Sequence, residues 1–153
     1  MCIRDRCQLG SDPDDGCSAP DGTAVDICAI LAANPDIALA HFDCDGDTFE
    51  NIDECNAGSD PNDGCSIPAG QSIDICAILA ADPNSPLGMF DCDNGGIDNL
   101  TECNAGTNPN DPNDDCQAAI AGMVDICAII AANPSSPLAN QDCDGDGFSN
   151  NQE

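Results

Sequence analysis

The chain has 153 residues, a formal net charge of -27 at pH 7 and only two basic residues, Arg4 and Arg6. All of its 29 acidic residues except Asp5 follow Arg6, so 28 carboxylates share a stretch that contains no Lys or Arg. This charge excludes nucleic acid and anionic membranes as direct partners, and it favours cations.

The apolar residues of the chain are too small to form a large core. Hydrophobic residues make up 41%, but much of this is Ala and Cys, with four Phe and no Tyr or Trp. Burial alone would hardly offset the entropy of a chain rich in Gly, Pro, Asn and Asp. The thirteen cysteines predict a disulfide scaffold and an oxidising compartment outside the cytosol. Zinc or iron-sulfur sites would need Cys-x-x-Cys pairs, which are absent.

The cysteines divide the chain into three predicted repeats, 7–54, 55–102 and 103–153. Successive cysteines are 10, 11, 16 and 11 residues apart in the first two repeats, and the third repeat opens with a gap of 13. Residues 1–6 fall outside this pattern and are interpreted as a non-native prefix. Glu153 stands one residue before the next expected cysteine, so we expect the sequence to be a window of a longer array.

Each repeat begins with a turn rich in Asp-Pro and Asp-Gly pairs, followed by a predicted helix. The clearest helix runs over 116–132, ends at Asn133-Pro134 and has Asp114 or Asp115 as its expected cap. The matching helical cores are 27–32 and 75–80. A linker containing proline and an acidic loop complete the repeat. The predicted fold class is a small disulfide-rich, calcium-stabilised tandem repeat with short α-helices, irregular loops and little or no β structure.

Four cysteines per repeat allow several disulfide pairings, including pairs between repeats. Cys116 and Cys127 should not pair, because eleven residues of continuous helix separate them by about 16 Å, which no disulfide spans. If every repeat uses one scheme, the most economical bridges close each turn and tie each helix to the following loop. That scheme joins Cys7–Cys17, Cys28–Cys44, Cys55–Cys65, Cys76–Cys92, Cys103–Cys116 and Cys127–Cys143.

Each repeat ends in a twelve-residue acidic loop, at 43–54, 91–102 and 142–153. Side-chain oxygens at positions 1, 3, 5, 9 and 12, with a carbonyl at position 7, match the spacing of a calcium-binding loop. One such stretch is usually a solvated turn, but three in register favour metal sites. The predicted ligands are Asp43, Asp45, Asp47, Phe49, Asn51 and Glu54 in the first loop, Asp91, Asp93, Ile97, Asn99 and Glu102 in the second, and Asp142, Asp144, Asp146, Phe148, Asn150 and Glu153 in the third.

The three loops are not equivalent. The third has every expected residue, with Gly147 at the sharp-turn position 6. In the first loop Thr48 replaces that glycine, which predicts mild backbone strain. In the second loop Gly95 takes the place of the position-5 carboxylate, so we expect weaker binding or the recruitment of water or a neighbouring group. Asp12 and Asp15, and the matching Asp60 and Asp63, either complete neighbouring sites or simply form turns.

The segment Asp142–Gly147, together with the turns Gly58–Pro61 and Gly106–Pro109, resembles the bacterial form of the thrombospondin type 3 repeat. That resemblance implies calcium-dependent, disulfide-stapled arrays on secreted and surface proteins. Its implied partners are calcium ions, neighbouring repeats of the same parent chain, and extracellular matrix or cell-surface ligands.

The sequence therefore predicts a non-enzymatic calcium-binding stalk, spacer or adhesive segment of a secreted or cell-surface bacterial protein. His41 is expected to be a surface residue, and no base is evident that would activate a serine. One alternative is an accessory, non-catalytic region of a large secreted hydrolase. Another is a dockerin-like docking module, which is disfavoured because Gly58 follows the first loop too closely for a long helix; an EF-hand pair is set aside for the same reason.

Overall fold

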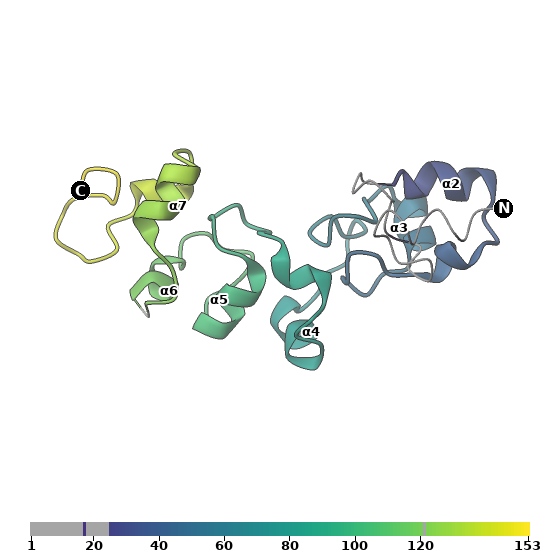
Figure 1. Ribbon diagram of the computed structural model, residues 1–153, viewed down its shortest axis with the longest axis horizontal. Helices are drawn as coiled ribbons and strands as arrows, with labels where there is room; N and C mark the ends of the chain where they lie inside the picture. The colour runs from purple at the N-terminus through teal and green to yellow at the C-terminus, as the bar shows by residue number, and fades with distance from the viewer. Residues whose placement is uncertain (1–16, 18–24, 121) are drawn as a thin grey trace, which may run out of the picture. The chain divides into compact units, whose positions relative to one another are not determined.

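The computed structural model describes Cys17, residues 25–120 and residues 122–153. The chain divides into two compact units, Met1–Ser72 and Ile73–Glu153. Within the described residues the secondary structure consists of short helices joined by loops, and no β-strand forms (Figure 1). This confirms the predicted fold class of a small, disulfide-rich protein of short helices and irregular loops. The predicted prefix and Cys7 lie outside the described residues.

The first unit contains three described helices around a small apolar cluster. They are α2 (Ile27–Ala33), the 3-10 helix η1 (Ala38–His41) and α3 (Asn51–Ala57). α2 contacts both η1 and α3, and Ile27, Leu31 and Ala40 are buried between them. A cluster of this size supports the view that apolar burial is a minor part of the stability of the fold.

The second unit repeats this arrangement and extends it. Its described helices are α4 (Ile75–Ala81), η2 (Pro86–Met89), α5 (Asn99–Ala105), α6 (Cys116–Ile120), α7 (Ile126–Ala132) and η3 (Pro137–Asn140). α4 contacts α5 and η2, as α2 contacts α3 and η1 in the first unit. Ile75, Leu79 and Leu87 form the buried apolar cluster around α4. A further cluster forms around Ile97, Ala118 and Leu138, so the loop before α5 shares a core with α6 and η3.

Three helices begin in the same way. Asp26, Asp74 and Asp125 each accept a hydrogen bond from the backbone N–H three residues later, at 2.9, 3.0 and 3.2 Å. Such N-caps satisfy one of the free N–H groups of the first turn. The predicted helical cores 27–32 and 75–80 are confirmed, and each helix extends one residue further.

The continuous helix predicted over 116–132 is wrong, because α6 ends at Ile120 and α7 begins at Ile126. Gly122 between them has φ of 74°, a left-handed conformation that ends a helix. The expected cap is also wrong. The carboxylate of Asp114 accepts the N–H of Asn108 at 3.0 Å, and neither carboxylate oxygen of Asp115 has a hydrogen-bond partner.

Two helices that the sequence analysis did not expect begin at position 9 of the first and second acidic loops. α3 and α5 are each seven residues long and end at a left-handed glycine, Gly58 or Gly106. Ile52 of α3 packs on the first apolar cluster and Leu100 of α5 on the second unit's Ile75 cluster. The sequence disfavours a dockerin-like module and an EF-hand pair because Gly58 leaves no room for a long helix after the loop. That reason holds only in part, because α3 and α5 exist but are short.

The disulfides interleave rather than closing each turn. The pairs are Cys17–Cys44, Cys28–Cys55, Cys76–Cys103 and Cys116–Cys143, each with a sequence separation of 27 residues. Cys65 and Cys92 are also disulfide-bonded, and Cys127 is free and exposed. All six bridges of the economical scheme are therefore wrong, since α3 and α5 carry their cysteines back against the preceding helix. The exclusion of a Cys116–Cys127 bond is confirmed.

Candidate metal sites

The backbone of the first acidic loop folds around its own aspartates. Asp43 accepts the N–H groups of Gly46 and Thr48 through its two carboxylate oxygens, at 2.7 and 2.9 Å. Asp47 accepts the N–H of Phe49 at 2.8 Å. Thr48 has φ of 83°, which is unfavourable for a β-branched residue and confirms the predicted strain.

The asparagine at position 9 of each loop holds the loop against the preceding 3-10 helix. The Asn51 amide donates to the carbonyl of Leu39 at 2.7 Å and to the sulfur of Cys44 at 3.2 Å, and its oxygen accepts the N–H of Cys44 at 3.3 Å. Asn99 and Asn150 make the same three contacts in their own loops. The asparagines predicted as metal ligands at position 9 therefore use their side-chain amides in hydrogen bonds that hold each loop to its 3-10 helix.

Carboxylates of the first loop converge on one point. Oxygens of Asp43, Asp45 and Asp47 lie within 4.8 Å of one another. Glu54, in the first turns of α3, is fully buried with Asp45 and Asp47. One oxygen each of Asp45 and Asp47 and both oxygens of Glu54 are buried without a hydrogen-bond partner. Buried carboxylate oxygens without donors are costly, and a cation would satisfy all four.

The electrostatics of the first loop agree with this geometry. Burial, followed by the negative charges of Asp45 and Asp47, raises the pKa of Glu54 to about 8. Burial, then the charge of Asp47, raises the pKa of Asp45 to about 7. Both shifts arise because these carboxylates lose water and face one another. No Lys or Arg follows Arg6, so no permanently charged basic side chain offsets these raised pKa values.

The second loop gathers three carboxylates from two segments. Oxygens of Asp93, Glu102 and Asp115 lie within 4.8 Å of one another. Six buried oxygens here lack a hydrogen-bond partner: one each from Asp91 and Asp93, and both from Glu102 and Asp115. Burial raises the pKa of Glu102 and of Asp115, and the charge of Asp93 raises both further.

Asp115 is a candidate metal ligand that the sequence analysis does not include, because the sequence suggests for it only the role of a helix cap. It lies outside the twelve-residue loop, immediately before Cys116. Alignment of the repeats by their cysteines gives a signal for this residue, because Asp115, which precedes Cys116, is aligned with Gly64, which precedes Cys65. An aspartate at a position that is glycine in the preceding repeat calls for an explanation.

The third loop has the same backbone path but an open cluster. Asp142 accepts the N–H groups of Gly145 and Gly147 at 2.7 and 2.9 Å. Oxygens of Asp142, Asp144 and Asp146 converge, yet all three residues are exposed. Residues 150–152 form a turn, and Glu153 is exposed; the charge of Asp144 raises its pKa.

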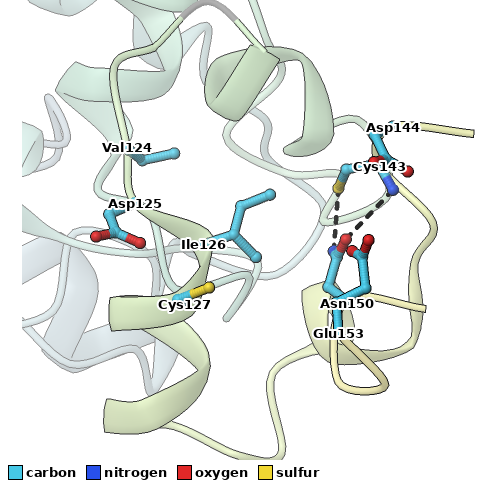
Figure 2. A pocket seen from close by; sticks show the side chains of 8 residues that line it. All are labelled: Val124, Asp125, Ile126, Cys127, Cys143, Asp144, Asn150 and Glu153. Atoms are coloured by element: carbon cyan, nitrogen blue, oxygen red, sulfur yellow. Dashed lines mark hydrogen bonds between the residues drawn. The ribbon is translucent and has the colours of Figure 1, made fainter. Parts of the chain in front are cut away.

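Figure 2 shows Asp144, Asn150 and Glu153 across a pocket from Cys127. The loop that the sequence ranks as the most complete is therefore the least enclosed. Its residues match the pattern, and Glu153, the last residue of the sequence, is exposed where the equivalent Glu54 and Glu102 are buried within α3 and α5. The position-7 carbonyls of Phe49, Ile97 and Phe148 stay predictions.

The remaining predicted candidates have local roles. His41 is exposed and its ring lies 2.7 Å from the Glu50 carboxylate, which confirms it as a surface residue. Asp60 and Asp63 accept backbone N–H groups two residues ahead, at 3.1 Å each, as turn-forming aspartates do. Asp12 and Asp15 lie outside the described residues.

Comparison of the chain with protein-family models, with curated proteins and with solved structures gave no match. The functional argument therefore depends on the geometry of the sites. The structure contains acidic groups that can hold metal ions and a set of disulfides typical of oxidising, extracellular environments. Among the described residues, no helix has the length and apolar character needed to span a bilayer.

Proposed function

We propose that this chain is a calcium-binding structural segment, a stalk, spacer or adhesive region, of a secreted or cell-surface bacterial protein. One observation carries the proposal. Within the described residues, every buried side-chain nitrogen or oxygen without a hydrogen bond is a carboxylate oxygen of the first or second acidic cluster. Native proteins rarely leave such groups unpaired, and a bound cation would satisfy these carboxylate oxygens.

The donor set favours a hard divalent cation. Carboxylate oxygens suit calcium and magnesium, whereas zinc and copper favour nitrogen and sulfur ligands. Calcium accepts six to eight oxygens in flexible geometry, but magnesium requires an octahedron and gives up its water reluctantly. A buried glutamate offering two oxygens beside several aspartates fits the calcium requirement better.

In this proposal the ions and the disulfides act together. Calcium neutralises carboxylates that otherwise repel one another, and it fixes the loop backbone that these carboxylates already organise. The disulfides hold the helix that carries each buried glutamate against the preceding helix. Without calcium, the charge of the first two clusters opposes the compact state. Extracellular modules with sites of this kind bind calcium at about 10⁻⁴ to 10⁻³ M, a range suited to millimolar external calcium.

The short helices α3 and α5 give a docking function its one supporting observation, because a docking module could present such a helix to a partner. Their inward residues already have partners in this chain. Ile52 and Leu100 pack on the apolar clusters, and Cys55 and Cys103 are bonded to the preceding helix. These contacts favour the structural role over docking.

Thermal unfolding tests the proposal. At calcium tenfold above the dissociation constant, each site should add about 1.4 kcal/mol of stability. Two sites should then raise the melting temperature of metal-stripped protein by roughly 5–10 °C. Sodium chloride at matched ionic strength is the control for screening, and magnesium at the same concentration should stabilise less. An unchanged melting temperature at millimolar calcium would contradict the proposal.

A further inference from the structure

The first two acidic loops differ by a reciprocal exchange between two positions. The first loop has Asp47 at position 5, and in the turn that follows this loop the residue before Cys65 is Gly64. The second loop has Gly95 at position 5, and the corresponding residue before Cys116 is Asp115. Each loop together with the turn that follows it therefore contains one carboxylate for these two positions.

The geometry of the second loop matches that exchange. A Cβ built on Gly95 would overlap the carboxylate of Asp115. The backbone of Gly95 is not left-handed, unlike that of Gly96 at φ of 107°, so backbone conformation does not require glycine there. Asp115 therefore occupies the space that a side chain at position 95 would need.

Asp115 is also aimed into the cluster rather than at the surface. It is fully buried, and so is Glu102. All four carboxylate oxygens of this pair lack a hydrogen-bond partner. Asp115 lies outside the loop pattern, so its fully buried, unpartnered carboxylate is an independent observation that points to a ligand within the cluster.

The segments around Asp115 are packed against the same loop. Ile97, at position 7, is buried with Ala118 and Leu138. The hydroxyl of Ser136 donates a hydrogen bond to the carbonyl of Gly95. A Cβ on Gly96 would lie 2.5 Å from Cγ2 of Ile129. The second loop is thus enclosed by residues of the following repeat, and Asp115 is the one of these that brings a charge.

We propose that the second acidic loop binds its ion jointly with Asp115, so that the metal links loop 91–102 of one repeat to the turn before α6 in the next. This inference rests on the proposed function. The expected ligand is a hard divalent cation, with calcium as the probe. The ion then acts as a crosslink between consecutive repeats, beside the disulfide that starts at Cys116.

Hydrogen exchange read peptide by peptide tests this proposal, because each loop reports separately in one sample. Wild-type protein is titrated with calcium and protection is followed in 43–54, 91–102 and 107–118. The variants are Asp115→Asn, which removes the charge at nearly constant shape, and the exchange pair Gly95→Asp with Asp115→Gly. That pair rebuilds in the second loop the arrangement of Asp47 and Gly64. Peptide mapping of the disulfides verifies that each variant is folded.

In wild-type protein, 91–102 and 107–118 should gain protection with the same calcium midpoint. Asp115→Asn should move the midpoint of 91–102 upward by at least about tenfold and abolish the calcium response of 107–118. The exchange pair should restore the response of 91–102 but not that of 107–118, and 43–54 should be unchanged throughout. An unaltered midpoint of 91–102 in Asp115→Asn would overturn the shared site. No calcium response in either 43–54 or 91–102 of the wild-type protein would instead overturn calcium binding itself.

Discussion

Cys28 in α2 is bonded to Cys55 in α3, directly after Glu54, whose fully buried carboxylate interacts electrostatically with Asp45 and Asp47 of the first acidic loop. The second unit repeats the relationship, because Cys103 follows the buried Glu102 and is bonded to Cys76. In both units a covalent bond therefore fixes the helix that brings the innermost carboxylate to the loop. Disulfide formation and metal binding should be linked.

Removing the Cys28–Cys55 bond should weaken both stability and calcium binding. The paired change Cys28→Ser and Cys55→Ser opens a 27-residue loop, which should cost about 3–4 kcal/mol of stability. Calcium should recover part of this loss, because the ion still draws Glu54 to the loop. Thermal unfolding with and without calcium measures both effects, and Cys127→Ser serves as the control that removes a thiol but no bridge. Equal calcium affinity in the paired variant and the wild type would contradict the link.

Thr48→Gly should stabilise the protein. Thr48 is held at φ of 83°, where glycine has no steric penalty, and relief of that strain should exceed the added entropy of the unfolded chain. We expect a net gain of about 0.5–1 kcal/mol in the free energy of unfolding, measured by denaturant titration. Thr101→Gly, within α5, is the matched control and should lose about 0.3–0.5 kcal/mol through the lower helix propensity of glycine. A loss in both variants would show that Thr48 is not strained.

The metal-free protein should lose stability as the pH rises. Folded-state pKa values of about 7 for Asp45 and about 8 for Glu54 lie above their ordinary values near 4. Between about pH 4 and pH 8 the folded state binds more protons than the unfolded state, so the free energy of unfolding falls with rising pH. Calcium competes with these protons, and its stabilising effect should therefore grow over the same range.

Melting temperatures of metal-stripped protein at pH 5, 6, 7 and 8 would check this slope, with and without calcium. Glu54→Gln cannot ionise at that position, so its metal-free stability should decline less steeply. Glu50→Gln, on the exposed side chain that contacts His41, should keep the wild-type slope. Metal-free stability that increases from pH 5 to pH 8 would contradict the raised pKa values.

Cys127 should react with an alkylating reagent without prior reduction, because it is exposed and unbonded, whereas the disulfide-bonded cysteines should not. The equivalent cysteines of α2 and α4 each pair with a cysteine that directly follows a loop glutamate. A variant extended after Glu153 by a copy of residues 55–60 should therefore lose the Cys127 thiol on oxidation. Mass spectrometry after alkylation reads both states, and an extension with serine in place of its cysteine is the control. A reactive Cys127 in the oxidised, extended variant would disprove the pairing rule.

Local sequence signals predicted part of the local structure. The helical cores 27–32 and 75–80 follow from apolar spacing, and the strain at Thr48 follows from a missing glycine. The continuous helix predicted over 116–132 was wrong, because α6 ends at Ile120 and α7 begins at Ile126. What depends on contacts distant in sequence was not predicted. The Cys28–Cys55 bond requires α3 to fold back on α2, and a seven-residue helix ending at Gly58 has little intrinsic stability to announce it.

The same distinction applies to the candidate sites. The carboxylates of the first loop are close in sequence, and their convergence was expected from spacing alone. Asp115 reaches the second cluster from beyond α5, so a twelve-residue pattern cannot include it. The third loop has every residue of the pattern, but its aspartates are exposed. The pattern records which residues are present, whereas the burial of a loop depends on the packing of a helix against it.

Calorimetric titration of metal-stripped protein with calcium tests the central claim most directly. The account predicts two enclosed sites that bind at millimolar calcium or below and a third, open site that binds more weakly. Glu54→Gln should remove or weaken one of the two enclosed sites by at least about tenfold, while Glu50→Gln should leave all three unchanged. No calcium-dependent heat at millimolar concentration, or equal binding by Glu54→Gln and wild-type protein, would contradict the account.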